Sequence, residues 1–312
     1  MMLVIGTDEA GYGPNLGPLV VAATAWRIDA PPAEAEAAVG AAAAEARRSD
    51  GRPLWADSKQ VLRGGTGFAA LETGALAGTA LAAGAVPVGW TALATALEAG
   101  PIDPVPEEDR LAALGLPLEA DAADVAAVTT RVRAGLAARG VVLAAVRVRV
   151  VPPAAFNALL DDGLNKSDLL SRTTLDLAAS LCAGRCEPTV VWCDRHGGRR
   201  RYAGLVARHF GGALVRTAEE TAARSAYEVP EAGLRVEFSV GGEARAPVAL
   251  ASMTAKYVRE LAMRAFNAHW TARCPGLAAT AGYPVDAARW RRDAAGVVER
   301  EGVAWDALWR RA

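Results

Sequence analysis

Hydrophobic and polar positions occur along the chain in blocks that predict alternating strands and helices. Met2 to Asp8 is a short aliphatic and β-branched run, a loop rich in glycine and proline follows, and residues 19–26 form a second apolar run. This order predicts a strand, a turn and a second strand. The alanine-rich segments 30–48 and 66–83 favour helices through intrinsic propensity.

The middle of the chain repeats the order strand, helix, strand. Residues 141–151 and 189–193 are apolar runs that predict buried strands, and segment 164–181 between them has a helical pattern. Apolar residues at helical spacing over 202–209 and a further strand at 213–218 come next. This succession predicts a β-α-β unit with parallel strands, and therefore the α/β fold class.

Three further segments define the expected domain organisation. Prolines and a helical pattern between 85 and 140 predict an inserted segment, and residues 225–240 predict a hairpin insert. Both inserts belong to an expected catalytic domain of residues 1–270, which ends in a long amphipathic helix. The tryptophans and arginines of 271–312 predict a C-terminal helical extension.

Composition narrows the class of protein. The chain has 312 residues, 52% of them hydrophobic, so it can bury a core without disulfides, and its four cysteines lack CxxC spacing and are expected to be reduced, buried thiols. The net charge of -1 means that a nucleic-acid surface must be a local basic patch.

The N-terminus has no signal-peptide pattern, and the uncharged stretch 73–97 is rich in alanine and glycine and contains Pro87. We therefore expect a cytoplasmic monomer without a membrane span.

Carboxylates follow two of the expected strands. Asp8 and Glu9 end the first strand, and Asp194 ends a central one. A carboxylate at a buried strand end is costly unless a cation or hydrogen bonds compensate for its charge. Adjacent side chains of a strand point to opposite faces, so Asp8 and Glu9 can share a site only if Glu9 already lies in the glycine turn. The alternative is that these acids cap helices or pair with arginines.

Other common sites are excluded by their context. The Gly11-x-Gly13-x-x-x-Gly17 spacing precedes a strand and not a helix, and the neighbouring acids would repel a pyrophosphate, which excludes a dinucleotide site. No P-loop lysine motif occurs, and the three histidines have no nucleophile motif around them. We expect these histidines to be structural.

Five motifs in order resemble ribonucleases HII and HIII of the ribonuclease H superfamily. They are Gly6–Pro14 with Gly17-Pro18, Asp57-Ser58-Lys59, Asp194 at a strand end, Ala251–Lys256 and Gly282-Tyr283-Pro284. Five ordered motifs are more specific than any one of them. The resemblance implies a ribonuclease H-like, mixed five-stranded sheet flanked by helices, and a two-metal site for Mg²⁺ or Mn²⁺.

The resemblance also implies an activity, the hydrolysis of the RNA strand of RNA/DNA hybrid duplexes by a two-metal-ion endonuclease. Catalytic metal ligands would be Asp8, Glu9 and Asp194. Substrate-binding residues would be Gly11, Tyr12, Gly13, Lys59, Ser252, Lys256 and Tyr283. The lysines could instead form surface salt bridges, and Tyr283 could pack in the core. Alternative functions are a catalytically silent hybrid-binding protein on the same fold and a superfamily nuclease that acts on another nucleic acid.

Two residues compete for a fourth carboxylate, which the resemblance places just before the helix of Ser252. Glu243 has the better local match, because Gly242-Glu243 precedes Pro247 at a similar spacing. Glu220 has the better topology, because 213–218 is the first strand available to lie parallel to and beside the strand of Asp194. Glu243 would then lie on an outer strand, about 10 Å from the metals. We favour Glu220 as the catalytic metal ligand, with Glu243 as the alternative.

The chain departs from the family pattern near its acids. Tyr12 replaces the arginine usual between the first two motif glycines in ribonuclease HII, and Arg195-His196 follows Asp194 in place of a glycine. With one positive contact missing at Tyr12, we expect stretches of hybrid to be cut at least as well as single embedded ribonucleotides. The basic residues at 195 and 199–201 either contact phosphates or form a solvated helix start.

Overall fold

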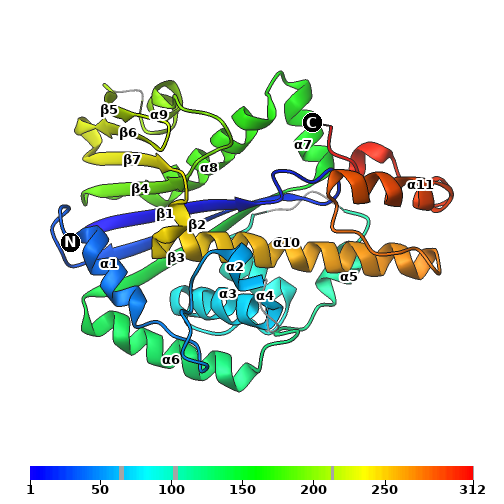
Figure 1. Cartoon of the computed structure of the whole chain (residues 1–312), viewed down its shortest axis with the longest axis horizontal. Coiled ribbons are helices and arrows are strands. Elements are labelled where there is room, and N and C mark those ends of the chain that lie inside the picture. Colours follow the sequence, from blue (N-terminus) through cyan, green and yellow to red (C-terminus); the bar gives the residue numbers. More distant parts are fainter. Residues whose placement is uncertain (63–66, 101–104, 212–213, 312) are drawn as a thin grey trace.

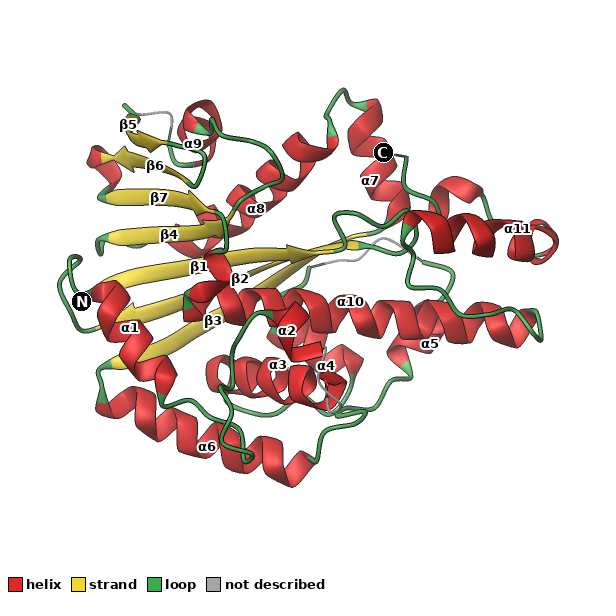
Figure 2. Ribbon diagram, viewed as in Figure 1, coloured by secondary structure: helices red, strands yellow, loops and turns green. Residues whose placement is uncertain are grey.

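The computed structural model describes residues 1–62, 67–100, 105–211 and 214–311. They form a seven-stranded mixed sheet with helices packed on it (Figures 1 and 2). The strands are β1 (Met2–Ala10), β2 (Leu19–Ile28), β3 (Val141–Val151), β4 (Thr189–Asp194), β5 (Arg216–Glu220), β6 (Arg224–Val229) and β7 (Leu234–Ser239). The α/β class is confirmed. The expected number of five strands is wrong, because β5 and β6 extend the sheet beyond β7.

The strand order is β3-β2-β1-β4-β7-β6-β5. Strands β1, β2 and β3 pair antiparallel, whereas β4 is parallel to both β1 and β7. In the segment expected as a hairpin insert, 225–240, β6 and β7 do pair antiparallel around the short 3-10 turn Pro230–Ala232. However, β7 also pairs with β4 in the interior of the sheet. The expectation that strand 213–218 lies beside β4 is wrong, because β5 pairs only with β6 at the sheet edge; residue 213 lies outside the described residues.

Helices cover the sheet in two layers, which Figure 2 shows. The helices are α1 (Ala35–Ala44), α2 (Ser58–Leu62), α3 (Gly67–Ala83), α4 (Trp90–Ala96), α5 (Glu108–Ala112), α6 (Ala122–Ala138), α7 (Pro153–Asp161), α8 (Lys166–Cys182), α9 (Ala203–His209), α10 (Ala246–Arg273) and α11 (Pro284–Arg300). Helix α10 runs along β1 and β2, with α3 and α6 beside it against β3. Helices α7, α8 and α9 bury the other face.

The segment expected as an insert, 85–140, contributes to the main core. Its longest helix, α6, points Val125, Val128, Val132 and Leu136 inward at helical spacing, and all four belong to the cluster under α10. Residues 101–104 of this segment lie outside the described residues. The C-terminal extension packs as well, because a third apolar cluster joins α11 to the second half of α10.

The carboxylate of Glu72, on α3, ties this segment to the core. Its side chain is buried and accepts the backbone N–H groups of Leu118, Glu119 and Ala120 at 2.7–2.8 Å. The Tyr257 hydroxyl of α10 donates to the same carboxylate at 2.7 Å. Four donors therefore compensate for one buried charge, which links α3, α10 and the 118–120 turn.

We expect Glu72→Gln to lower the free energy of unfolding by about 3 kcal/mol, because the amide group would face a donor in a buried position. Urea denaturation measures the change. Glu119→Gln is the matched control, since Glu119 pairs with Arg264 on the surface and its loss should cost under about 0.5 kcal/mol. Equal stability of the two variants would show that the Glu72 contacts are not important.

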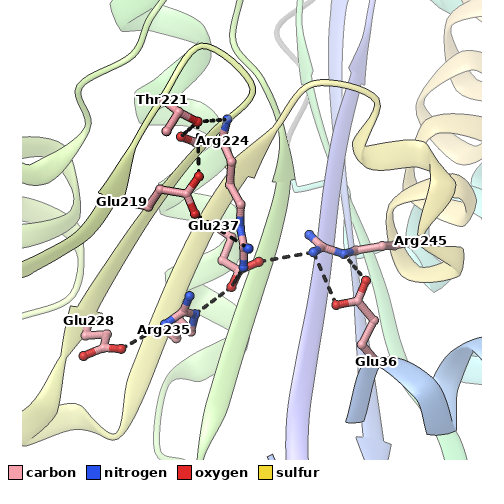
Figure 3. Close-up of polar contacts among 8 residues, drawn as sticks. All are labelled: Glu36, Glu219, Thr221, Arg224, Glu228, Arg235, Glu237 and Arg245. Carbon is pink, nitrogen blue, oxygen red and sulfur yellow. Dashed lines mark hydrogen bonds and ion pairs between the residues drawn. The ribbon is translucent and has the colours of Figure 1, made fainter. Parts of the chain in front are cut away.

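An ionic network covers the sheet face that lies away from α8 and α9, as Figure 3 shows. Glu237 on β7 has a side chain only 5% exposed and lies between Arg224, Arg235 and Arg245. Burial opposes its ionisation, but hydrogen bonds from Arg235 and Arg224 hold the pKa of Glu237 below its usual value. Arg245 continues the network to Glu36 of α1 at 2.8 Å. The network fixes α1 and the start of α10 against β7.

Two expectations from composition can be compared with the structure. Among the described residues, no helix is long and apolar enough to cross a membrane. The four cysteines are free thiols, and Cys193 is buried. The expectation of burial is wrong for Cys186, which is exposed where the chain leaves α8 for β4.

Candidate active site

Asp8 and Glu9 lie where β1 loses one of its two neighbours. Pairing of β1 with β4 ends at Thr7, opposite Cys193, whereas pairing with β2 continues to Ala10. The expectation that Glu9 must lie beyond the strand is wrong, because both acids are still in β1. They reach one cavity because the sheet is open on the β4 side after Thr7.

The carboxylate of Asp8 is oriented by short contacts. Its Oδ1 accepts the backbone N–H of Glu9 at 2.8 Å, and the nearby Ser252 hydroxyl favours the ionised form of the carboxyl group by lowering its pKa. The Ser58 hydroxyl lies 3.0 Å from that of Ser252, which extends the chain of contacts to α2. Burial, with the nearby charges of Glu9 and Asp194, raises the pKa of Asp8 well above its usual value.

Asp194 and Glu243 form the opposite wall. Asp194 ends β4, and its Oδ1 accepts the backbone N–H of Gly242 at 2.9 Å. A Cβ at Gly242 would lie 3.1 Å from the Cα of Asp194, so the turn after β7 approaches β4 closely. This places the carboxyl group of Glu243 close enough to that of Asp194 for its charge to raise the pKa of Asp194.

Close packing of α10 on β1 brings a polar helix face to the acids. A Cβ at Gly6 would lie 2.2 Å from the carbonyl carbon of Pro247, in the first turn of α10. The Thr24 hydroxyl of β2 donates to the Pro247 carbonyl at 2.8 Å. Ser252 and Lys256, one and two turns further along α10, therefore line the cavity.

The resulting cavity has a volume of about 220 Å³. It is lined by Asp8, Glu9, Ala10, Gly11, Tyr12, Gly13, Pro14, Ser58, Lys59, Asp194, Glu243, Ser252, Lys256 and Tyr283. Burial and the Asp194 charge raise the pKa of Glu9 to about 7, although the exposed Lys59 ammonium opposes the shift. Lys256 forms a 2.6 Å ion pair with Glu260, and Tyr283 is 51% exposed at the rim. The cavity thus has an acidic floor and a rim with cations and an aromatic ring.

Glu220, the residue favoured on topology, does not lie in this cavity. It is exposed on β5, at the far edge of the sheet, and accepts a hydrogen bond from the Tyr227 hydroxyl. Its other oxygen lies 3.9 Å from Arg201. The topological argument for Glu220 is wrong, because the chain crosses from β4 to the sheet edge and returns inward through β6 to β7. That return puts Glu243, not Glu220, beside Asp194.

The carboxylate oxygens of this cavity are the kind of ligand that a hard divalent cation prefers. Within the described residues, the buried Oε2 of Glu243 has no hydrogen-bond partner. Burial raises the pKa of Asp194 to about 6, and the charge of Glu243 adds to this shift, although the N–H of Gly242 opposes it. A cation would relieve both the orphaned oxygen and the repulsion between carboxylates. Within the described residues, no three histidine, cysteine or acidic side chains are arranged to hold a metal ion as they stand.

Other sequence candidates have structural partners. The His196 ring is buried, its Nδ1 lies 3.0 Å from the Ser171 hydroxyl, and burial lowers its pKa to about 3. Of the basic run after Asp194, Arg199 pairs with Asp168. Sequence reasoning missed Lys166, whose ammonium lies 4.9 Å from the Tyr12 ring centroid. Only the fold could reveal this contact, because 153 residues separate the two along the chain.

Two larger cavities, of about 430 and 540 Å³, lie near Pro188 and Gly233 at the opposite end of β4. The acidic residues that line the cavity of about 430 Å³ form ion pairs with arginines, as Glu237 does with Arg235. The smaller cavity at the end of β1 is the better candidate, because its carboxylates raise one another's pKa and, within the described residues, form no ion pair with an arginine.

Neither a family model nor a curated protein matches the chain. Among solved structures, it is similar to the ribonuclease HII of Archaeoglobus fulgidus from a complex with PCNA, at 14% identity and a TM-score of 0.44, over 99% of this chain and 93% of that chain. The ribonuclease H2 of Pyrococcus horikoshii OT3 is similar at 16% identity and a TM-score of 0.44, over 98% and 92% of the chains. Bst-RNase HIII in complex with Mn²⁺ is similar at 17% identity and a TM-score of 0.39, over 96% and 71%. At these values the similarity does not assign the chain to a family.

Proposed function

We propose that the chain is a divalent-metal-dependent endonuclease of the ribonuclease H type that hydrolyses the RNA strand of RNA/DNA hybrid duplexes. The observation that supports it is the convergence of Asp8, Glu9, Asp194 and Glu243 in a cavity whose rim carries Lys59 and Lys256. In the described part of the chain these four acids form no ion pairs, which suits metal binding, and a basic rim suits a polyanionic substrate.

The proposed metal ligands are Asp8, Glu9, Asp194 and Glu243. When bound, Mg²⁺ or Mn²⁺ would supply an activated water and stabilise the leaving 3′-oxygen. Lys59 and Lys256 would contact phosphates next to the scissile bond, and Ser252 would orient Asp8 through its hydroxyl. The backbone N–H groups of the glycine loop, residues 11–13, would contact the ribose 2′-hydroxyl, which distinguishes RNA from DNA.

Cleavage of end-labelled duplexes tests the proposal directly. We expect the RNA strand of a hybrid to be cut with Mg²⁺ or Mn²⁺ and to remain intact with EDTA, whereas an all-DNA duplex is not cut. A hybrid that stays intact with either metal would reject the proposal. Cleavage of the DNA duplex would point to a nuclease with another substrate.

A catalytically silent hybrid-binding protein is the second candidate. The observation that favours it is that, within the described part of the chain, no three ligand side chains are placed to hold a metal. The two candidates differ in metal binding. Isothermal titration with Mn²⁺ should give a site that Asp194→Asn weakens if the chain is a nuclease, and no such site if it is silent.

Salt dependence tests whether the duplex backbone is bound. With roughly four phosphate contacts, affinity for the hybrid should fall about 100-fold between 50 and 200 mM salt, because contacts to phosphates release counterions. Fluorescence anisotropy with a labelled hybrid and Ca²⁺ measures the slope of log Kd against log salt. Lys59→Gln should reduce that slope by about one. An affinity independent of salt would contradict backbone binding at this rim.

A further inference from the structure

The segment between β1 and β2 contains the glycine loop, residues 11–13, and is held by residues from the far end of the chain. Asn15 and Leu16 donate their backbone N–H groups to the Gly282 carbonyl at 2.8 and 3.2 Å. The backbone N–H of Arg310 donates to the Asn15 carbonyl at 2.7 Å, and the Asn15 side chain donates to the Arg310 carbonyl at 3.2 Å. Figure 1 shows the C-terminal end beside α7, where Asn157 donates to the Trp309 carbonyl at 2.8 Å.

Arg259, on α10, packs directly beneath this loop. Its Nη2 donates to the carbonyls of Leu16 at 3.4 Å and Ala281 at 3.0 Å. Gly11 has φ +87°, and a Cβ there would lie 2.6 Å from Arg259 Nε. The guanidinium therefore fills space that only a glycine at position 11 leaves free.

Arg310 supports the loop from the other side. Its guanidinium donates to the Pro14 carbonyl and lies 5.0 Å from the ring centroid of Phe156. Arg310 and Arg259 are each only 1% exposed. Two cationic groups from distant parts of the chain thus bind the carbonyl groups of one loop.

Among the residues that the structure describes, neither arginine forms an ion pair. Arg259 Nε and the Nε and Nη1 of Arg310 have no hydrogen-bond partner within the described residues. Fully buried charges are rare in proteins unless they are paired, so this arrangement costs stability. A cost of this kind concentrates at functional sites, where a fixed geometry matters more than stability.

Binding of the carbonyls from below leaves the opposite side of the loop open to the cavity. Tyr12 and Gly13 line the cavity, and within the described chain their backbone N–H groups donate to no backbone or side-chain acceptor. Successive free N–H groups in a turn form a concave donor surface for an anion or a hydroxyl oxygen.

We propose that Arg259 and Arg310 are positioning residues that hold the glycine loop so that its N–H groups face the substrate ribose. The proposal rests on the proposed function for the ribose, whereas the support of the loop by the two arginines stands on the contacts alone. It adds a role for two buried residues that touch neither the metal ligands nor the substrate.

The test compares Arg259→Met and Arg310→Met with Asn15→Ala, which removes one contact without removing a charge. Arg133→Met is the matched control, because Arg133 also donates to two backbone carbonyls, those of Ala80 and Leu81, but on α3. Hydrogen exchange of the loop amides and thermal unfolding are measured for each variant. Affinities for a short RNA/DNA hybrid and for the matching all-DNA duplex are measured with Ca²⁺ in place of the catalytic metal.

In Arg259→Met and Arg310→Met we expect the rate of amide exchange at residues 11–16 to rise. The rise should be about tenfold larger than the one that the loss of global stability alone would cause. Hybrid affinity should fall about tenfold while affinity for the DNA duplex stays within about twofold, because loop contacts to the 2′-hydroxyl are lost. Asn15→Ala should give a smaller change in the same direction, and it keeps the test decisive if an arginine variant does not fold.

An equal fall of both affinities, or the same change in Arg133→Met, would overturn the proposal, since a purely structural role would weaken both duplexes alike. Unchanged exchange at the loop would overturn it as well. A wild-type protein that shows no preference for the hybrid would reject the proposed function instead, and loop exchange would still decide whether the arginines hold the loop.

Discussion

Asp8→Asn should abolish cleavage of an RNA/DNA hybrid while the protein stays folded. Asparagine keeps the shape of the side chain but removes a charge that the metal requires, so transition-state stabilisation of several kcal/mol is lost, which corresponds to about 10³-fold or more in rate. The fold should persist because the contact to the Glu9 N–H involves an oxygen that asparagine retains.

The same variant should be more stable than the wild type when no metal is present. The pKa of Asp8 and of Asp194 is raised in the folded chain by burial and by neighbouring carboxylates. A carboxyl group with a raised pKa binds its proton more tightly in the folded state, so it favours folding at low pH. This contribution is lost as pH rises through the folded-state pKa values, which are about 6 for Asp194 and about 7 for the neighbouring Glu9. Asp8→Asn removes one of the repelling charges. Its metal-free Tm at pH 8 should therefore exceed that of the wild type by about 5 °C.

Thermal unfolding with EDTA at pH 5 and pH 8 measures this effect, and single-turnover cleavage with Mn²⁺ measures the loss of activity. The difference in Tm should shrink at pH 5, where the wild-type carboxyls are largely protonated. Asp293→Asn, at an exposed i,i+4 pair with Arg289, is the control and should change neither quantity. Normal turnover by Asp8→Asn would remove Asp8 from the site. A lower Tm at pH 8 would show that its charge is not repelled in the folded protein.

The first part of the sheet could be predicted from sequence because its signals are local. Strands β1 and β2 are continuous apolar runs joined by a glycine and proline turn, and the hairpin of β6 and β7 surrounds Pro230 and Gly233. The order of strands beyond β4 depends on which strand pairs with which. That information is not local, and the rule that consecutive strands lie side by side is a tendency.

The polarity of the sequence does distinguish β5, which was expected beside β4, from β7, which lies there. Residues Arg216–Glu220 are almost all polar and exposed, which is typical of an edge strand. Strand β7 alternates Leu234, Val236 and Phe238 toward the buried face, as an interior strand does. This contrast would have placed β7 beside β4 and Glu243 beside Asp194.

The contacts around the glycine loop could not be predicted from the sequence for a different reason. Buried arginines look the same in sequence as surface arginines, and Arg259 falls at a position of α10 where a helical pattern assigns it to the polar face. Its burial depends on Gly11 and on the turn at Gly282, which meet only after the chain folds. Sequence patterns describe the faces of elements, whereas these contacts join the ends of several elements.

Glu243→Gln should lower hybrid cleavage by about 10²–10³-fold, whereas Glu220→Gln should leave it within about twofold of the wild type. Glu243 reaches the cavity from the turn Gly242–Ala244, next to Asp194. Among the described residues, its Oε2 has no hydrogen-bond partner that would compete with a metal. Glu220 lies on the third strand beyond β4, which at about 4.8 Å a strand places it roughly 14 Å away.

The two variants make a matched pair, because each replaces one carboxylate oxygen by an amide nitrogen and leaves the size of the side chain almost unchanged. Cleavage is measured at saturating Mn²⁺ and again across a Mn²⁺ titration. If Glu243 is a metal ligand, Glu243→Gln should also require more Mn²⁺ for half-maximal activity, which a loss of stability alone would not cause. The hydrogen bond from Tyr227 to Glu220 gives Glu220→Gln a stability effect only. Loss of activity in Glu220→Gln with Glu243→Gln unaffected would place the fourth carboxylate on β5, which requires the sheet edge to fold back over the cavity.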